Sequence, residues 1–434
     1  MLERVLAERD VKLVITVDCG ISSIEPVRLA IERGIDVIIT DHHLPPGNLP
    51  SAAAVLNPKQ PGCVYPFKEL AGVGVAFKLC CELIRRSGRK VSTASLLKIA
   101  AIGTIADVAP LIGENRTIAQ LGLSGLSDVR NPGLRALLRR VGLEGKAVRS
   151  SDIGFKIGPR INAAGRLASA NTAIDLFHAA DESSAWSICS ELDRMNAERQ
   201  QIEVQVRGAA EEQVVGGEKI LVLAGEGWHR GVVGLTAGRI AQKHYRPTLV
   251  IARDRERCVG SGRSITTINL HEQLERVADL FEHFGGHQFA CGFTLPSANL
   301  AALRSRLAEA FDELDDELFV RKASVDAVVT FAEIDRAFFE GHEMLQPFGA
   351  ANLQPVFMAA GVRVTSRRMF STDCWELQLD DGSATTRAVL WPSVLTLLSD
   401  LEGDGARDIL FTLDPDLRSP SGMRLTIADV RPAA

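Results

Sequence analysis

The sequence predicts an α/β protein of several domains, in which a parallel sheet comes first and a small closed β-barrel comes last. The chain has 434 residues, which is too long for one ordinary domain. Near the N-terminus, short β-branched runs alternate with helical periodicity, which is typical of a βαβ unit in a parallel sheet. After residue 323 the pattern changes to short alternating segments separated by turns, which indicates a barrel.

The N-terminal unit begins with an apolar strand over residues 12–17, which ends at Asp18. A helix over 24–33 and a second strand over 36–40 follow, and this strand ends at Asp41. Open α/β sheets bind their ligands beyond the carboxyl ends of the strands. We therefore expect both acidic turns to lie at a ligand site.

The middle of the chain is mainly helical. Residues 92–106 form an apolar helix that leads into Asp107, and a Gly-rich loop is predicted over 158–165. The polar helical pattern of residues 182–215 is interpreted as a helix that connects two domains. A second α/β unit with three Gly-rich turns runs from 219 to about 311.

Five short strands predicted in the C-terminal part fit an OB-like barrel. They lie at 362–366, 376–379, 386–390, 409–413 and 424–428. The chain thus divides into four predicted segments: a first α/β domain with the parallel sheet, a connecting helix, a second α/β domain and a C-terminal barrel. Their bounds are 1–180, 181–216, 217–320 and 323–434.

Composition excludes several classes of protein. Hydrophobic residues make up 46% of the chain, and no apolar run is long enough for a membrane span or a signal peptide, so we expect a soluble cytoplasmic protein without a membrane partner. The eight cysteines are scattered without a C-x-x-C pair, which argues against a zinc site and a disulfide framework. The formal charge of −5 does not by itself indicate nucleic-acid binding.

Three segments place acid or imidazole groups at the ends of apolar elements. They carry Asp18, then Asp41, His42 and His43, then Asp107. Carboxylates mixed with imidazoles suit Mn²⁺ or Mg²⁺ better than zinc, and such ions activate water against a phosphodiester. A single Asp at a strand end is more often a turn former. The three segments together favour a metal site.

The Gly-rich segments pair glycine with cationic or polar side chains, which suits close approach of the backbone to a phosphate. Each segment alone is a weak signal, because such glycines mostly serve tight turns. The candidate nucleic-acid-binding residues in these segments are Arg160, Asn162, Arg166, His229, Arg263, Ser264, Gly286 and His287.

Several motifs resemble those of the RecJ family of the DHH phosphoesterase superfamily. Asp18-Cys19-Gly20 and Thr40-Asp41-His42-His43 are similar to the second and third superfamily motifs. Further segments look like RecJ in particular, and the resemblance covers nearly the whole chain. They are residues 70–77, 103–111, 158–167, 228–234, 261–264, 285–292 and 347–357.

The resemblance implies a DHH catalytic domain, a long helix, a DHH-associated domain and an OB domain that holds single-stranded DNA. It further implies two Mn²⁺ or Mg²⁺ ions held by Asp18, His42 and Asp107, with Asp41 and His43 supporting the site or contacting the scissile phosphate. The implied reaction is hydrolysis of single-stranded DNA from 5′ to 3′, with release of 5′-mononucleotides in DNA repair and recombination. A RecQ-type helicase and a single-strand-binding protein are the partners that the family implies.

One feature departs from the family pattern. RecJ relatives carry an upstream strand with a D-x-D-x-D-G motif that supplies further ligands, but only seventeen residues precede Asp18 and none resembles it. We therefore expect the sheet to lack its first strand, and we expect this chain to bind metal weakly and to cut poorly.

Two other functions stay open. The chain could be another DHH-type phosphodiesterase, which acts on short oligonucleotides, or a non-catalytic DNA-binding scaffold that has lost its activity. A comparison of long DNA with dinucleotides would separate the first alternative, and DNA binding without cleavage would favour the second.

Overall fold

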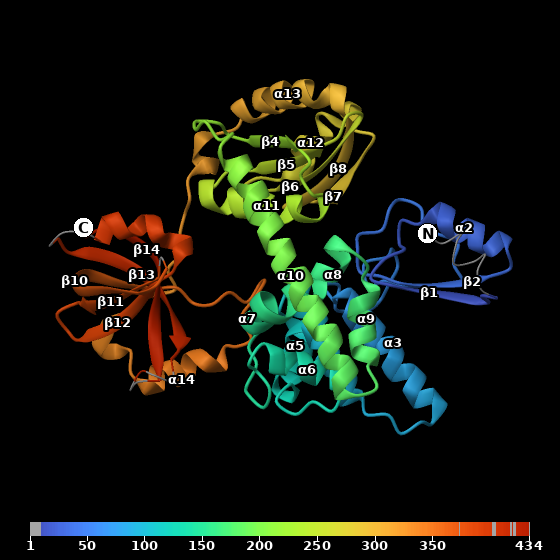
Figure 1. The fold of residues 1–434 in the computed structure, drawn as a ribbon, viewed down its shortest axis with the longest axis horizontal. Helices are drawn as coiled ribbons and strands as arrows, with labels where there is room; N and C mark the ends of the chain where they lie inside the picture. The colour runs from blue at the N-terminus through green and yellow to red at the C-terminus, as the bar shows by residue number, and fades with distance from the viewer. Residues whose placement is uncertain (1–9, 373, 402–404, 417–418, 420–421, 434) are drawn as a thin grey trace. The chain divides into compact units, whose positions relative to one another are not determined.

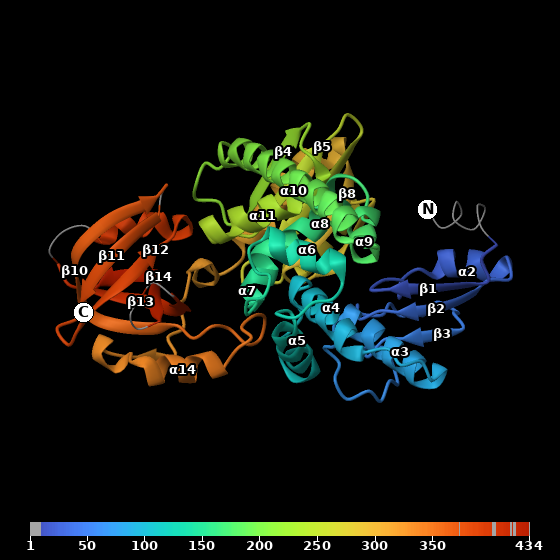
Figure 2. The same cartoon turned by 60° about the horizontal axis from the view of Figure 1, so that its bottom comes forward.

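The computed structural model describes every residue except 1–9, 373, 402–404, 417–418, 420–421 and 434 (Figure 1). Its first sheet consists of three parallel strands, β1 (Leu13–Val17), β2 (Asp36–Thr40) and β3 (Ala54–Leu56), as Figure 2 shows. The helix α2 (Ile24–Glu32) connects β1 to β2. The predicted βαβ unit is confirmed, and β1 lies at one edge of the described sheet.

A series of helices follows this sheet. The helix α4 contacts both α3 and α5, and its buried residues include Ala100 to Ile102. The long helix α10 (Glu182–Glu211) agrees with the predicted connecting helix. The other helices are α3 (Gly72–Ser87), α4 (Thr93–Ala106), α5 (Gly113–Gly125), α6 (Pro132–Arg140), α7 (Ser150–Asp152), a π-helix (Ile153–Ile157), α8 (Gly158–Leu167) and α9 (Asn171–His178).

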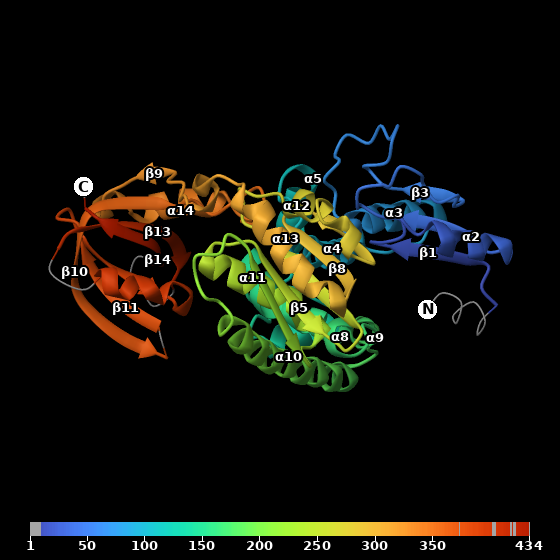
Figure 3. The same ribbon diagram turned by 90° about the horizontal axis from the view of Figure 1, so that it is seen from above.

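A second, mixed sheet has the strand order β4-β5-β6-β8-β7. Only β4 and β5 are parallel, and α11 (Arg230–His244) connects them. Leu249, Leu270 and Phe311 belong to its core, to which α12 (Leu270–Glu275) and α13 (Leu300–Asp312) contribute (Figure 3). The strands are β4 (Leu221–Glu226), β5 (Thr248–Arg253), β6 (Arg257–Arg263), β7 (His283–His287) and β8 (Ala290–Pro296).

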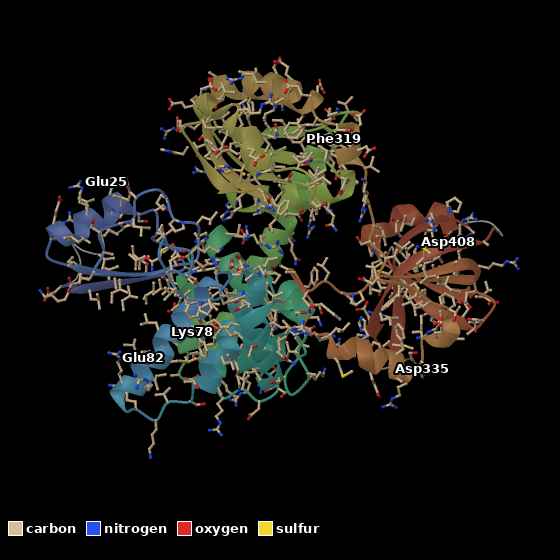
Figure 4. All side chains as sticks on the ribbon, turned by 180° about the vertical axis from the view of Figure 1, so that it is seen from behind. Glu25, Lys78, Glu82, Phe319, Asp335 and Asp408 are labelled. Atoms are coloured by element: carbon tan, nitrogen blue, oxygen red, sulfur yellow. The ribbon has the colours of Figure 1, made fainter. Side chains whose placement is uncertain are left out.

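The C-terminal strands form a closed ring in the order β10-β11-β12-β14-β13, and the short β9 (Ala327–Val328) adds to β10. All five predicted strands are present, and the prediction of an OB-like barrel is confirmed. Asp335 caps α14 (Arg336–Met344), which precedes the barrel (Figure 4). The strands are β10 (Phe357–Ser371), β11 (Cys374–Asp380), β12 (Thr385–Leu390), β13 (Arg407–Pro415) and β14 (Met423–Pro432).

Three predicted Gly-rich loops are regular structure instead. The segment 158–165 lies in α8, and the glycines at 260 and 262 and those at 285 and 286 lie in β6 and β7. The reason is tertiary packing, which overrides the local tendency of glycine to form turns. A Cβ at Gly260 would lie 2.2 Å from the ring of Phe293, so this glycine makes room for an aromatic side chain across the sheet.

The described residues form two compact units. One comprises the described residues within 1–159, 179–186 and 325–434, and the other comprises 160–178 and 187–324. Among the described residues, no helix is both long and apolar enough to cross a membrane. The four-segment domain division stays a prediction.

Candidate metal centre and arginine cluster

Asp18 and Asp41 follow neighbouring parallel strands, at the edge where both strands end. Val17 pairs with Thr40 in the register, and the Asp18 N–H donates to the Thr40 carbonyl at 2.9 Å. Asp18 has a left-handed backbone with φ 61°, which Asp adopts more readily than most residues. Its carboxylate faces Gly72 at the start of α3, where a Cβ would lie 2.1 Å from Asp18 Oδ1. Only glycine at position 72 leaves room for this carboxylate.

His42 lies between two carboxylates from different elements. Its Nε2 is 3.1 Å from Asp18 Oδ1 and 3.5 Å from Asp107 Oδ2, and Asp107 ends α4. These contacts are close, yet this buried nitrogen has no hydrogen bond of acceptable geometry among the described residues. The structure therefore brings together the three residues predicted to bind metal.

Asp41 and His43 form a pair beside this group. Asp41 is 1% exposed and accepts hydrogen bonds from the backbone N–H groups of Ile21, His42 and His43. Its Oδ1 lies 2.7 Å from His43 Nδ1. Burial alone would raise the pKa of Asp41, but these hydrogen bonds lower it below its usual value. The carboxylate is thus ionised and orients the imidazole of His43.

The protonation behaviour of the group suits a bound cation. Burial raises the pKa of Asp107, and the nearby charge of Asp18 raises it further. The Asp18 carboxylate raises the pKa of His42, although burial acts against it. Two carboxylates held close together around a buried imidazole are stabilised by a positive charge among them.

The donor set fits a divalent metal. One side-chain ligand atom each from Asp18, His42 and His43 lies within 4.8 Å of the other two, and Asp107 Oδ2 lies 3.5 Å from the same Nε2 of His42 that Asp18 approaches. The Nε2 of His42, which faces the carboxylates of Asp18 and Asp107, is placed to act as an imidazole ligand beside them. Hard carboxylates with imidazoles favour Mn²⁺ or Mg²⁺. His43, predicted to have a catalytic role, is thus also placed to bind metal.

A second group of charges lies in the other compact unit. Arg166 on α8 donates to the Gly231 carbonyl at 3.1 Å, and Arg263 on β6 bonds to Ser261 and to the Gly262 carbonyl. Burial lowers the pKa of Arg166 and of Arg263, and the like charge of Arg166 lowers that of Arg263 further. Two of the predicted nucleic-acid-binding residues are therefore neighbours in a largely desolvated position.

Two residues that sequence reasoning missed extend this arginine cluster, which we define as Arg166, Arg199, Arg239 and Arg263. Burial lowers the pKa of Arg199, as do the charges of Arg166 and Arg239, and its Nε has no hydrogen-bond partner among the described residues. Glu203, which is 1% exposed, pairs with Arg239 at 2.7 Å. An arginine in the middle of a long polar helix is common, so no local pattern distinguishes Arg199 from a surface residue.

The remaining predicted residues are more dispersed. Arg160 pairs with Asp193 at 2.5 Å, and Asn162 is exposed on α8. His229 caps α11 by accepting from the Gly231 N–H at 3.0 Å, and Ser264 donates to the Ile268 carbonyl. Gly286 and His287 lie on β7.

A cavity of about 1070 Å³ adjoins part of the arginine cluster. Arg166, Trp228, His229 and Arg230 line it together with the end of β5, the start of β6 and parts of β7 and β8. Of the predicted nucleic-acid-binding residues, Arg166 and His229 thus share one open cavity. Cationic side chains at a helix N-terminus are typical of anion-binding sites.

Family models match three parts of the chain. The DHH family N-terminal domain matches residues 2–104, the DHHA1 domain matches 217–316, and the RecJ OB domain matches 325–416. The matches follow the order of the parallel sheet, the mixed sheet and the barrel.

Several curated relatives are named single-stranded-DNA-specific exonuclease RecJ. The protein of Bacillus subtilis is 42% identical over 358 residues, which are 81% of this chain and 45% of the relative. The protein of Thermus thermophilus is 35% identical over 358 residues, which are 82% of this chain and 52% of the relative. The chain spans about half the length of these curated relatives.

Solved structures agree with the fold. RecJ of Thermus thermophilus in complex with Mn²⁺ superposes with a TM-score of 0.87 at 30% identity, over all of this chain and 64% of that one. A structure of exonuclease RecJ bound to manganese is 35% identical, with a TM-score of 0.62, over 75% of this chain and 81% of that one.

Proposed function

The chain belongs to the RecJ family, and from that membership we propose that it is part of a metal-dependent exonuclease that degrades single-stranded DNA. We propose hydrolysis from 5′ to 3′ with release of 5′-mononucleotides, which serves DNA repair and recombination. The observation that carries the proposal is the group of Asp18, His42 and Asp107, in which a buried imidazole nitrogen faces two carboxylates. Relatives that bear the RecJ name have been solved with Mn²⁺ and with Mg²⁺.

Each residue of the centre has a distinct part in the proposed reaction. Asp18, His42 and Asp107 would hold Mn²⁺ or Mg²⁺, and His43 adds a fourth candidate ligand. When bound, the metal supplies Lewis acidity and lowers the pKa of a coordinated water. Asp41 holds the ring of His43 through Nδ1 and so orients it, and the oriented ring would contact metal or a phosphate oxygen.

The arginine cluster is proposed to bind the phosphates of the strand. Arg166, Arg199 and Arg263 are partly desolvated, and the charge of Arg166 repels the other two, which an anionic phosphate would relieve. The barrel would hold the strand on its β-surface, as closed five-stranded barrels of this class do. A helicase and a single-strand-binding protein are proposed as partners from the family alone.

The experiment that tests this function is mononucleotide release from a 5′-phosphorylated single-stranded oligomer with Mn²⁺. The purified chain is compared with Asp107→Asn, which keeps the shape of the side chain and removes its charge. We expect release by the wild-type chain to fall about 100-fold or more in the variant, because a ligand to the metal is lost.

The matched control is Asp128→Asn, which makes the same change at an exposed position after α5. It should keep the wild-type rate. Equal rates for Asp107→Asn and wild type would contradict the proposed centre. DNA binding without release at any Mn²⁺ concentration would favour a non-catalytic scaffold, and faster cleavage of dinucleotides than of long DNA would favour a phosphodiesterase for short oligonucleotides.

A further inference from the structure

The loop that follows Asp107 is held by a segment far along the chain. Residues 108–112 lead from Asp107 into α5, and the Leu111 N–H donates to the Ala350 carbonyl at 2.7 Å. Leu111 is 1% exposed, and a Cβ added at Gly349 would lie 2.6 Å from its Cδ1. Backbone and side chain of Leu111 therefore both fit against residues 349–350.

This distant segment, residues 345–352, lies between α14 and β10 and is braced in itself. The side-chain amide of Asn352 donates to the carbonyls of Leu345 at 3.0 Å and Pro347 at 2.8 Å. Gly349 and Asn352 also exchange backbone hydrogen bonds at 2.9 and 3.2 Å. The segment is thus a closed turn rather than an extended linker.

The turn is also attached to α5 directly. Arg116, on the first turns of this helix, donates to the carbonyls of Leu345 at 2.8 Å and Gln346 at 3.1 Å. The Asp107 loop and the helix after it are therefore bound to residues 345–352 at three points.

The opposite side of the Asp107 loop is held by a buried amide. Asn115 is fully buried, donates to the Pro110 carbonyl at 3.1 Å and accepts from the Ala71 N–H at 3.1 Å. Ala71 immediately precedes Gly72, the residue that faces the Asp18 carboxylate. The side chain of Asn115 thus links the loop that follows Asp107 to the backbone that faces Asp18.

The loop needs such support because its backbone is strained. Val108 has φ 57°, a conformation that β-branched residues rarely adopt, and it is 70% exposed, so little packing of its own side chain stabilises it. Strain of this kind persists only where the surrounding structure fixes it. The long-range contacts that hold this loop come from Asn115 and from residues 345–352.

We propose that residues 345–352 form a strap that holds the Asp107 loop in its metal-binding conformation. Gly349 and Asn352 are then positioning residues for the metal centre, although neither touches metal or substrate. The strap leads directly into the barrel, so it couples the barrel to the centre. The role of Asp107 in this inference rests on the proposed function.

The first test is hydrogen–deuterium exchange of the whole chain without metal. In Gly349→Ala the new methyl group displaces Leu111, and in Asn352→Ala the turn loses two hydrogen bonds. Exchange over residues 107–112 should become at least about fivefold faster in both variants. The matched control is Gly341→Ala on α14, where a Cβ meets nothing within 4 Å, and it should leave this exchange unchanged.

The second test is a Mn²⁺ titration followed by electron paramagnetic resonance. The two strap variants should bind Mn²⁺ about tenfold more weakly than wild type, as is usual when support behind a ligand is lost, while Gly341→Ala should bind normally. Because coupling is reciprocal, Mn²⁺ should slow exchange over residues 345–352 in wild type but not in Asp107→Asn.

The outcomes separate the two proposals. Unchanged exchange over residues 107–112 in both strap variants would show that residues 345–352 do not hold the loop, whatever the result of the Mn²⁺ titration. Faster exchange with unchanged Mn²⁺ affinity would overturn its positioning role. No Mn²⁺ binding by the wild-type chain would instead contradict the proposed function, and the metal-free exchange comparison would still decide whether the strap holds the loop.

Discussion

The backbone conformation of Val108 is set by its position directly after the candidate ligand Asp107. This residue occupies the left-handed position after the C-terminal end of α4, where glycine is the usual residue. Its side chain is 70% exposed, so burial of valine does not account for its presence. The conformation instead sets the direction in which the chain leaves Asp107, and a stiff side chain restricts the alternatives.

Replacing Val108 by glycine should therefore separate stability from metal binding. A left-handed non-glycine residue costs about 1–2 kcal/mol, which exceeds the ~0.5–1 kcal/mol entropic cost of glycine. We expect Val108→Gly to raise the thermal midpoint by about 2 °C. Since glycine leaves the loop more freedom, the affinity for Mn²⁺ should fall. Calorimetry of unfolding and a Mn²⁺ titration measure the two effects.

Val64→Gly is the control for this change, because Val64 is 95% exposed and has no left-handed backbone. It removes the same side chain without relieving strain, so the midpoint should not rise. A fall in the midpoint of Val108→Gly as large as that of Val64→Gly would show that the valine is not strained.

Sequence reasoning grouped the candidate metal ligands, but it did not find the residues that support them. Asp18, His42 and Asp107 were predicted as a group, and the structure places them together. Asn115 was not predicted, because a single Asn in a helix has no local pattern that separates a buried hub from a surface residue. Its importance comes from contacts with residues 44 and 46 positions earlier, which only the fold creates.

At the scale of elements, the glycines led to a wrong prediction of loops, whereas two of the arginines singled out beside them are neighbours in the fold. The segments around Arg166 and Arg263 were predicted as loops, yet they are the helix α8 and the strand β6. Regular elements hold these arginines more rigidly than loops would, which suits a site that must keep like charges together. The five barrel strands were predicted because alternation of apolar residues is a local signal that packing reinforces.

The arginine cluster predicts opposite effects on stability and on DNA binding. Arg166→Ala removes one of several mutually repelling, partly buried charges, so stability should not fall despite the lost contact with Gly231. Affinity for single-stranded DNA should fall, and the slope of log affinity against log salt should become shallower by about 0.7. Fluorescence anisotropy at several salt concentrations measures both quantities.

Arg304→Ala provides the comparison, since Arg304 is exposed and outside the cluster. It removes the same charge from the same compact unit. Equal losses of affinity in the two variants would mean that the cluster is not a specific phosphate site and that only net charge matters.

At the scale of the whole molecule, the order of the sheets was predictable but the long-range ties were not. Each sheet has its own local periodicity, which the sequence displays. The hydrogen bond between Leu111 and Ala350 and the ion pair between Arg149 and Glu343 join residues that no short window contains. These ties connect the helical part of the first unit to the segment that precedes the barrel.

His342, which lies next to the ion-paired Glu343, predicts that the stability of the folded chain decreases in acid. His342 on α14 is 4% exposed and lies among the rings of Phe339 and Phe348. Burial lowers its pKa, although nearby Glu343 acts against this. The unfolded chain therefore takes up the proton first, at pH about 6.5, and the free energy of unfolding falls by about 1.4 kcal/mol per pH unit below that value until the folded state is protonated too.

His342→Leu should remove this part of the pH dependence, because leucine does not titrate and suits the aromatic surroundings. Glu343 does not interfere: burial would raise its pKa, but Arg149 lowers it, so its contribution is lost only below pH about 4.5. Urea unfolding between pH 7 and 5 should give a flatter profile for the variant than for wild type. His271→Leu, at a side chain that is 31% exposed, should keep the wild-type slope. Parallel profiles for wild type and His342→Leu would mean that the pKa of His342 is the same in the folded and the unfolded chain, and that its burial does not link this segment to pH.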